Sequence, residues 1–183
     1  EIERSCIRFI AMEQPLATDL MYIESSIRVI SHVKRIAYLC RNIAESAATI
    51  EGIKVSNKIM GDLEYMADYV QIMLTRGFGS FCNQDISVAR ELASDDDKVD
   101  DLQKKIEEKC IKYIASEQPL ATDLRKIMTV SKIVTDLERM ADHAVDICKI
   151  TKRLGGNVKS FKESSDELWG MDKKVRAMIK SSI

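Results

Sequence analysis

The chain has 183 residues and a net charge of −1, and 45% of its residues are hydrophobic whereas only 5% are aromatic. This length and apolar content are sufficient for a substantial buried core. The near-neutral charge and the lack of a basic tract argue against nucleic-acid binding, which needs positive charge against the phosphates. No apolar run approaches the ~18 residues of a membrane span and no signal peptide is visible, so we expect a cytoplasmic domain.

Apolar residues recur at intervals of three or four along most of the chain, which predicts an all-α fold. In the first half we expect three helices, at 1–12, 15–50 and 54–76. Gly77 and Gly79 interrupt the third pattern and are expected to end that helix. Because the chain starts inside a helical pattern, we expect the beginning of the first helix to lie upstream of Glu1.

The second half repeats this plan. Here we expect helices at about 83–116, 119–153 and 159–182. Asn83 or Asp85 is suited to cap the first of them. Pro119 suits the first position of the second helix, and Gly155 with the following glycine is expected to end it. Short connections between long helices favour antiparallel neighbours.

The phrase EQPLATDL occurs twice, at 13–20 and at 117–124, an offset of 104 residues. Similar residues flank both copies, and a repeat this long indicates a duplicated supersecondary unit. We therefore predict two pseudo-symmetric three-helix bundles, at 1–80 and 81–183, with the first bundle missing most of its first helix.

The helix predicted at 83–116 carries a run of acidic residues on two faces. At about 100° per residue, Asp96 and Asp100 fall beside the apolar stripe, whereas Asp97 and Asp101 fall on the opposite face. One pair can therefore face a neighbouring helix while the other pair lies in solvent.

The helix predicted at 119–153 carries a second acidic pair, Glu138 and Asp142, with Asp146 one turn further on. Carboxylates four residues apart point the same way and repel each other. If the two helices are neighbours, four carboxylates converge, and they cannot all stay ionised without cations. Oxygen ligands suit Mg, Mn or Fe, with Zn also open. The alternative is a solvated acidic surface with Arg139 and Lys98 as partners.

Few other residues point to chemistry. His143 follows Asp142 but points about 100° away from it, so it is not an obvious co-ligand, and a ligand or supporting role is the less favoured interpretation. There is no Glu-x-x-His motif for a ferritin-like oxidase site, no nucleophile–base pair and no glycine-rich phosphate loop, so we do not expect an enzyme. None of the five cysteines forms a Cys-x-x-Cys pair, and we expect reduced core residues.

Three features of the sequence together resemble the PhoU family. They are the paired QPLATDL openings, the LERMADH motif at 137–143 and the DDKVD motif at 96–100. The resemblance implies two three-helix bundles, and metal clusters held by Glu/Asp-x-x-x-Asp pairs on adjacent helices. Carried over by position, the metal ligands would be Asp96, Asp100, Glu138 and Asp142, with Asp146 as a further candidate.

The first repeat departs from this pattern. Lys34 and Tyr38 occupy the positions equivalent to Glu138 and Asp142 in the second repeat. A lysine replaces an anionic ligand with a cation, so we expect no metal site in the first repeat.

The resemblance also implies a function. PhoU-like proteins are cytoplasmic adaptors that act between a phosphate ABC transporter ATPase and a two-component sensor kinase, restraining phosphate uptake and starvation signalling when phosphate is plentiful. A second hypothesis is a regulatory domain of a larger protein, such as the tail of a sodium–phosphate cotransporter or a fusion to a DNA-binding module. A third is a carboxylate-bridged metalloenzyme, which the missing Glu-x-x-His motif argues against. The sequence leaves a homodimer open.

Overall fold

The computed structural model describes residues 2–15, 17–49, 57–92 and 94–155, and every regular element in these ranges is a helix. The helices are α1 (Ile2–Glu13), α2 (Ala17–Ala48), α3 (Asn57–Asn83), α4 (Ile86–Leu92), α5 (Asp96–Glu117) and α6 (Ala121–Leu154). The all-α prediction is confirmed. None of these helices has a stretch long and apolar enough to cross a membrane.

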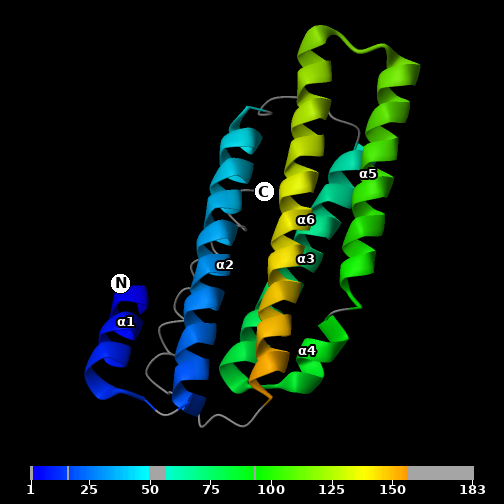
Figure 1. The fold of residues 1–183 in the computed structure, drawn as a ribbon. Helices are drawn as coiled ribbons and strands as arrows, with labels where there is room; N and C mark the ends of the chain where they lie inside the picture. The colour runs from blue at the N-terminus through cyan, green and yellow to red at the C-terminus, as the bar shows by residue number, and fades with distance from the viewer. Residues whose placement is uncertain (1, 16, 50–56, 93, 156–183) are drawn as a thin grey trace.

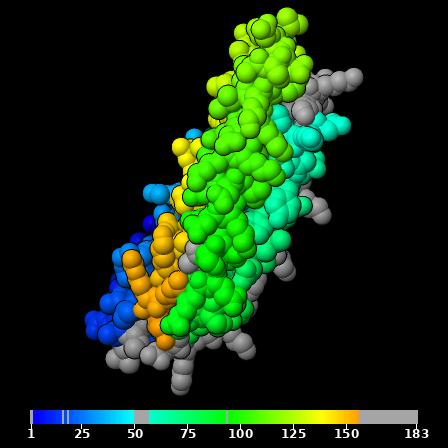
Figure 2. Space-filling view, turned by 90° about the vertical axis from the view of Figure 1, so that its right-hand side faces the viewer, coloured from blue at the N-terminus to red at the C-terminus, as the bar shows by residue number. Residues whose placement is uncertain are grey.

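Helix α6 is the element on which the others pack. It contacts α2, α3, α4 and α5, while α1 packs against α2. In Figure 1, α2 and α5 flank α6 on either side, and α2 runs antiparallel to it. Figure 2 shows that α5 covers one face of the molecule, between α3 and α6. Helix α6 thus has α2 on one side and α5 on the other.

The core follows a regular spacing. Buried residues recur seven apart on three helices: Val29, Ile36 and Ile43 on α2, Leu63, Val70 and Gly77 on α3, and Val130, Leu137 and Ala144 on α6. Two turns of an α-helix span about seven residues, so each set lies along one side of its helix. All five cysteines are buried, which confirms their predicted place in the core.

The predicted end of the third helix is wrong, because α3 continues through Gly77 and Gly79 to Asn83. Gly77 is buried where α3 approaches α6 closely. A Cβ atom at this position would lie 3.1 Å from the carbonyl oxygen of Ala144 and 3.5 Å from its Cα. The glycine therefore serves helix–helix packing rather than helix termination.

The single helix predicted at 83–116 is also wrong, since α4 and α5 are separate. Asp85 begins α4 as proposed, with its carboxylate accepting hydrogen bonds from the backbone N–H groups of Ser87 and Val88 at 2.9 and 3.2 Å. Between α4 and α5, Arg76 of α3 donates hydrogen bonds to Glu91 at 2.8 Å and to Asp95 at 2.9 Å. This arginine joins both sides of the break and leaves Asp96 as the first residue of α5.

The sequence repeat has a structural counterpart. Helices α1 and α5 end at the equivalent residues Glu13 and Glu117, and α2 and α6 begin at Ala17 and Ala121, two residues after each proline. Gln14 and Gln118 both take left-handed backbone conformations, with φ of 43° and 44°. The helix–turn–helix unit is therefore built twice with the same turn.

The end of α6 agrees with the prediction. Gly155 has φ of 69°, and its N–H donates to the carbonyl of Lys152. The helix predicted at 159–182 lies outside the described residues. The division into bundles at 1–80 and 81–183 consequently stays a prediction.

Candidate metal centre

The two faces of the acidic run on α5 are distributed as the helical spacing predicts. Asp97 and Asp101 are exposed, whereas Asp96 and Asp100 are half-buried. Helix α5 packs on α6, where Glu138 is also half-buried and Asp142 is exposed. The four carboxylates predicted as metal ligands therefore lie at the border between α5 and α6.

These carboxylates act on one another across that border. Burial raises the pKa of Asp96, and repulsion from Asp142 and Asp100 raises it further. Burial likewise raises the pKa of Glu138, with added repulsion from Asp142 and Asp100. Each helix thus contributes negative charge to the same region, and a cation there would relieve the repulsion.

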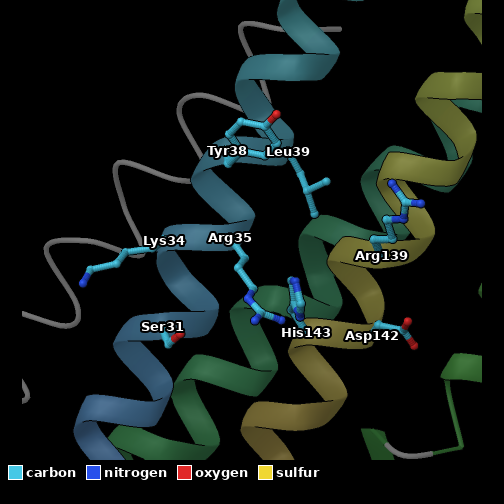
Figure 3. Close-up of a pocket in the computed structure, with 8 residues that line it drawn as sticks. All are labelled: Ser31, Lys34, Arg35, Tyr38, Leu39, Arg139, Asp142 and His143. Carbon is cyan, nitrogen blue, oxygen red and sulfur yellow. The ribbon is translucent and has the colours of Figure 1, made fainter.

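Asp142 belongs to the same group. Its pKa is raised by burial first and then by repulsion from Asp146 and Asp100. Figure 3 shows His143 pointing toward α2 and the carboxylate of Asp142 pointing away from it. Asp142 nevertheless lines the cavity between α2 and α6 together with His143, and its carboxylate also interacts with Asp100 of α5.

The alternative of a neutralised acidic surface gains little support from the proposed partners. Arg139 pairs with Asp136 at 3.5 Å, and Lys98 pairs with Asp95 at 3.1 Å. Within the described ranges, none of the four candidate ligands is ion-paired to a lysine or arginine. The nearby charges of Arg139 and Lys149 only partly offset the repulsion.

The four carboxylates suit a hard cation in their chemistry, but their oxygen atoms are not gathered around one point. Among the described residues, no three of these acids have ligand oxygens that all lie within 4.8 Å of one another. Because Glu138 and Asp142 are partly exposed, their side chains can rotate toward a shared ion. The donor set therefore fits a metal, while the bound arrangement requires side-chain movement.

A different group of side chains is already gathered. His32 of α2, His143 of α6 and Asp146 have ligand atoms that lie within 4.8 Å of one another. Asp146 also pairs with Lys149 at 2.9 Å. The fifth candidate ligand thus lies with the histidines as well as next to Asp142. The sequence carries no signal for His32 as a ligand, because its contact with His143 depends on which residues of α2 and α6 meet.

In the first repeat, the positions equivalent to the acids of α6 have other partners. Lys34 donates to Glu3 of α1, which joins α1 to α2. Tyr38 is exposed and lies beside the guanidinium of Arg41. In the first repeat these two positions therefore hold a lysine and a tyrosine that contact other residues, and they provide no pair of acids. That no metal binds there stays a prediction.

The raised pKa values predict how stability depends on pH without metal. The ordinary pKa is 4.5 for Glu138 and 3.8 for Asp142, and both are raised in the folded protein. The folded state therefore holds these protons more tightly than the unfolded chain, and a penalty develops as pH rises from the ordinary values through the raised ones. The double variant Glu138→Gln/Asp142→Asn should gain stability over the natural chain across this window.

Urea unfolding in the presence of a chelator at a series of pH values measures this difference. Below the ordinary pKa values both proteins carry neutral groups, and their stabilities should approach each other. A difference that is the same at every pH would contradict the proposed repulsion.

Comparison with known proteins adds independent information. A family model described as the PhoU domain matches residues 1–47 and 63–151. The phosphate-specific transport system accessory protein PhoU homolog 1 of Methanothermobacter thermautotrophicus is 40% identical over 150 residues, covering 82% of this chain and 67% of that protein. The PhoU homolog of Clostridium acetobutylicum is 50% identical over 101 residues, covering 55% and 45%. PhoU of Escherichia coli is 33% identical over 102 residues, covering 56% and 40%.

Proposed function

Since the chain belongs to the PhoU domain family, we propose that it is a cytoplasmic regulatory adaptor in phosphate homeostasis. The relatives are named accessory proteins of phosphate-specific transport systems, which supports a role associated with phosphate transport. In the finer form of the proposal, the protein restrains phosphate uptake and starvation signalling when phosphate is plentiful. Its partners are then the ATPase of a phosphate ABC transporter and a two-component sensor kinase.

The observation that carries this proposal is the family match across both copies of the repeated helix–turn–helix unit. The relatives are named as accessory proteins, which favours an adaptor over an enzyme. Because this chain spans 45% of the Clostridium relative and 67% of the Methanothermobacter one, the activity of the whole protein is part of the proposal.

The test is association and uptake measured together. The protein containing this chain should capture the transporter ATPase and the sensor kinase from purified mixtures, at high phosphate more than at low phosphate. A strain lacking it should continue to take up phosphate when phosphate is plentiful. No capture at any phosphate concentration, together with unchanged uptake in the deletion strain, would overturn the proposal.

We also propose that Asp96, Asp100, Glu138 and Asp142 bind a divalent or trivalent metal between α5 and α6. The mutual repulsion of these carboxylates supports this proposal. Oxygen ligands are compatible with Mg, Mn, Fe or Zn. Elemental analysis of the protein purified without chelator identifies the metal, and Glu138→Ala/Asp142→Ala should lower its content without unfolding the chain. Equal metal content in both proteins would contradict the site.

A further inference from the structure

Two helices that are distant in sequence bring three ligand-type side chains together where α2 meets α6, with Asp146 one helical turn from Asp142. His32 of α2 and His143 of α6 are 111 residues apart, yet their Nδ1 atoms lie 3.3 Å from each other. The Oδ2 atom of Asp146 lies 4.0 Å from Nδ1 of His32. We propose that His32, His143 and Asp146 form a second site, which binds a zinc-class divalent ion between α2 and α6.

The distances suit such an ion. Zinc binds imidazole nitrogen at about 2.0–2.1 Å, and two ligands of a tetrahedral centre then lie about 3.3 Å apart. The two Nδ1 atoms already have this separation. The carboxylate of Asp146 lies 4.0 Å from Nδ1 of His32, so it must approach by about 0.7 Å to reach this separation, which its partial exposure permits. Three protein ligands leave the fourth position to water or another small ligand.

The protonation state also suits metal binding. In a hydrogen bond between two Nδ1 atoms, at least one imidazole is neutral, because one nitrogen must accept. Burial lowers the pKa of His32 and of His143, and Arg35 lowers both further, while the charge of Asp146 opposes this change only in part. Both rings can therefore present an unprotonated nitrogen at neutral pH, as metal coordination requires.

Positive side chains nearby oppose a cation, but their charges are partly used. Lys149 pairs with Asp146 at 2.9 Å and Arg28 pairs with Glu24 at 2.6 Å. Both pairs lie on the surface, where such pairs contribute little to stability, so releasing Asp146 costs little. Arg35 and Arg153 also line the cavity of His32 and Asp146 and have no ion pair among the described residues. Figure 3 shows the side chain of Arg35 extending from α2 toward His143. Replacing Arg35 should therefore strengthen binding of a cation.

Solvent reaches the three ligands. A cavity of about 250 Å³ is lined by His32 and Asp146, and a neighbouring one of about 470 Å³ is lined by His143. An ion can enter between α2 and α6 without opening the core. This site should also prefer a different metal from the site formed by the four carboxylates, since imidazole suits Zn whereas carboxylate and water suit Mg.

The chain contains only two histidines, so labelling histidine with ¹⁵N reports on this site alone. Addition of one equivalent of Zn²⁺ to the full chain should shift the Nδ1 signals of both rings, whereas Mg²⁺ should leave them in place. If Zn²⁺ leaves both signals unchanged, the proposal is wrong. This result needs no variant and no transport partner, so it is separate from the test of the adaptor function.

Variants then assign the ligands. His143→Gln should weaken Zn²⁺ binding, measured by calorimetry, by at least ~10-fold. This is the smallest loss typical of removing a residue that only supports a metal ligand, and His143 is proposed as a ligand itself. Arg35→Gln should strengthen it, because a positive neighbour is removed. The control Glu138→Gln/Asp142→Asn should keep the histidine shifts. Unchanged affinity in His143→Gln, or loss of the shifts in the control, would overturn the assignment.

Discussion

Replacement of Gly77 by valine is expected to lower the free energy of unfolding by about 2–3 kcal/mol. The first added carbon would lie 3.1 Å from the carbonyl oxygen of Ala144, and that oxygen belongs to the backbone of α6. A backbone atom cannot rotate away as a flexible side chain can, so α3 and α6 must separate. Both helices carry core residues seven apart along this contact, and separating the helices weakens the packing of all these residues.

Gly61 provides a matched control on the same helix. A Cβ atom there meets nothing within 4 Å among the described residues. Gly61→Ala should therefore raise the free energy of unfolding by about 0.5–1 kcal/mol, the usual advantage of alanine over glycine inside a helix. Chemical denaturation of both variants measures the two effects. Equal stability of Gly77→Val and the natural chain would show that α3 and α6 do not pack as closely as described.

The second large effect is expected on metal addition. Mg²⁺, a hard ion that suits carboxylates and is not expected at the histidine site, should raise the free energy of unfolding by about 2.7 kcal/mol when supplied at 100 times its Kd, if it binds only the folded chain. In Glu138→Gln/Asp142→Asn this rise should disappear. In the presence of chelator the order should reverse, with the variant more stable at neutral pH, because repulsion between the acids of α5 and α6 is relieved.

Asp97→Asn/Asp101→Asn is the control for this experiment. It neutralises the same number of carboxylates, but both of these side chains are exposed. Its response to metal should match that of the natural chain. A loss of the metal response in this control would show that total negative charge on α5, rather than the proposed site, binds the ion.

Helical periodicity predicted the parts of this structure that depend on one helix at a time. It placed Asp96 and Asp100 on the packed side of α5 and Asp97 and Asp101 in solvent, because side chains advance by about 100° per residue. The repeat also predicted equivalent helix–turn–helix units, which Gln14 confirms with the same φ as its counterpart. These features follow from local rules and from comparison of the chain with itself.

Features that depend on contacts between helices could not be obtained in this way. The separation of α4 from α5 has no glycine or proline to indicate it, and Arg76 reaches it from another helix. Gly77 has the appearance of a helix end because its close approach to Ala144 is invisible in the sequence. The contact of His32 with His143 likewise depends on the relative position of α2 and α6.

The matching turns at Gln14 and Gln118 have a consequence for how the two repeats can diverge. The hairpin geometry is held by residues at the turn, whereas Lys34 and Glu138 occupy equivalent positions roughly five helical turns further along. Scaffold and chemistry are thus encoded in separate stretches of each copy. One copy can therefore change its chemical side chains while the geometry of the shared turn is kept.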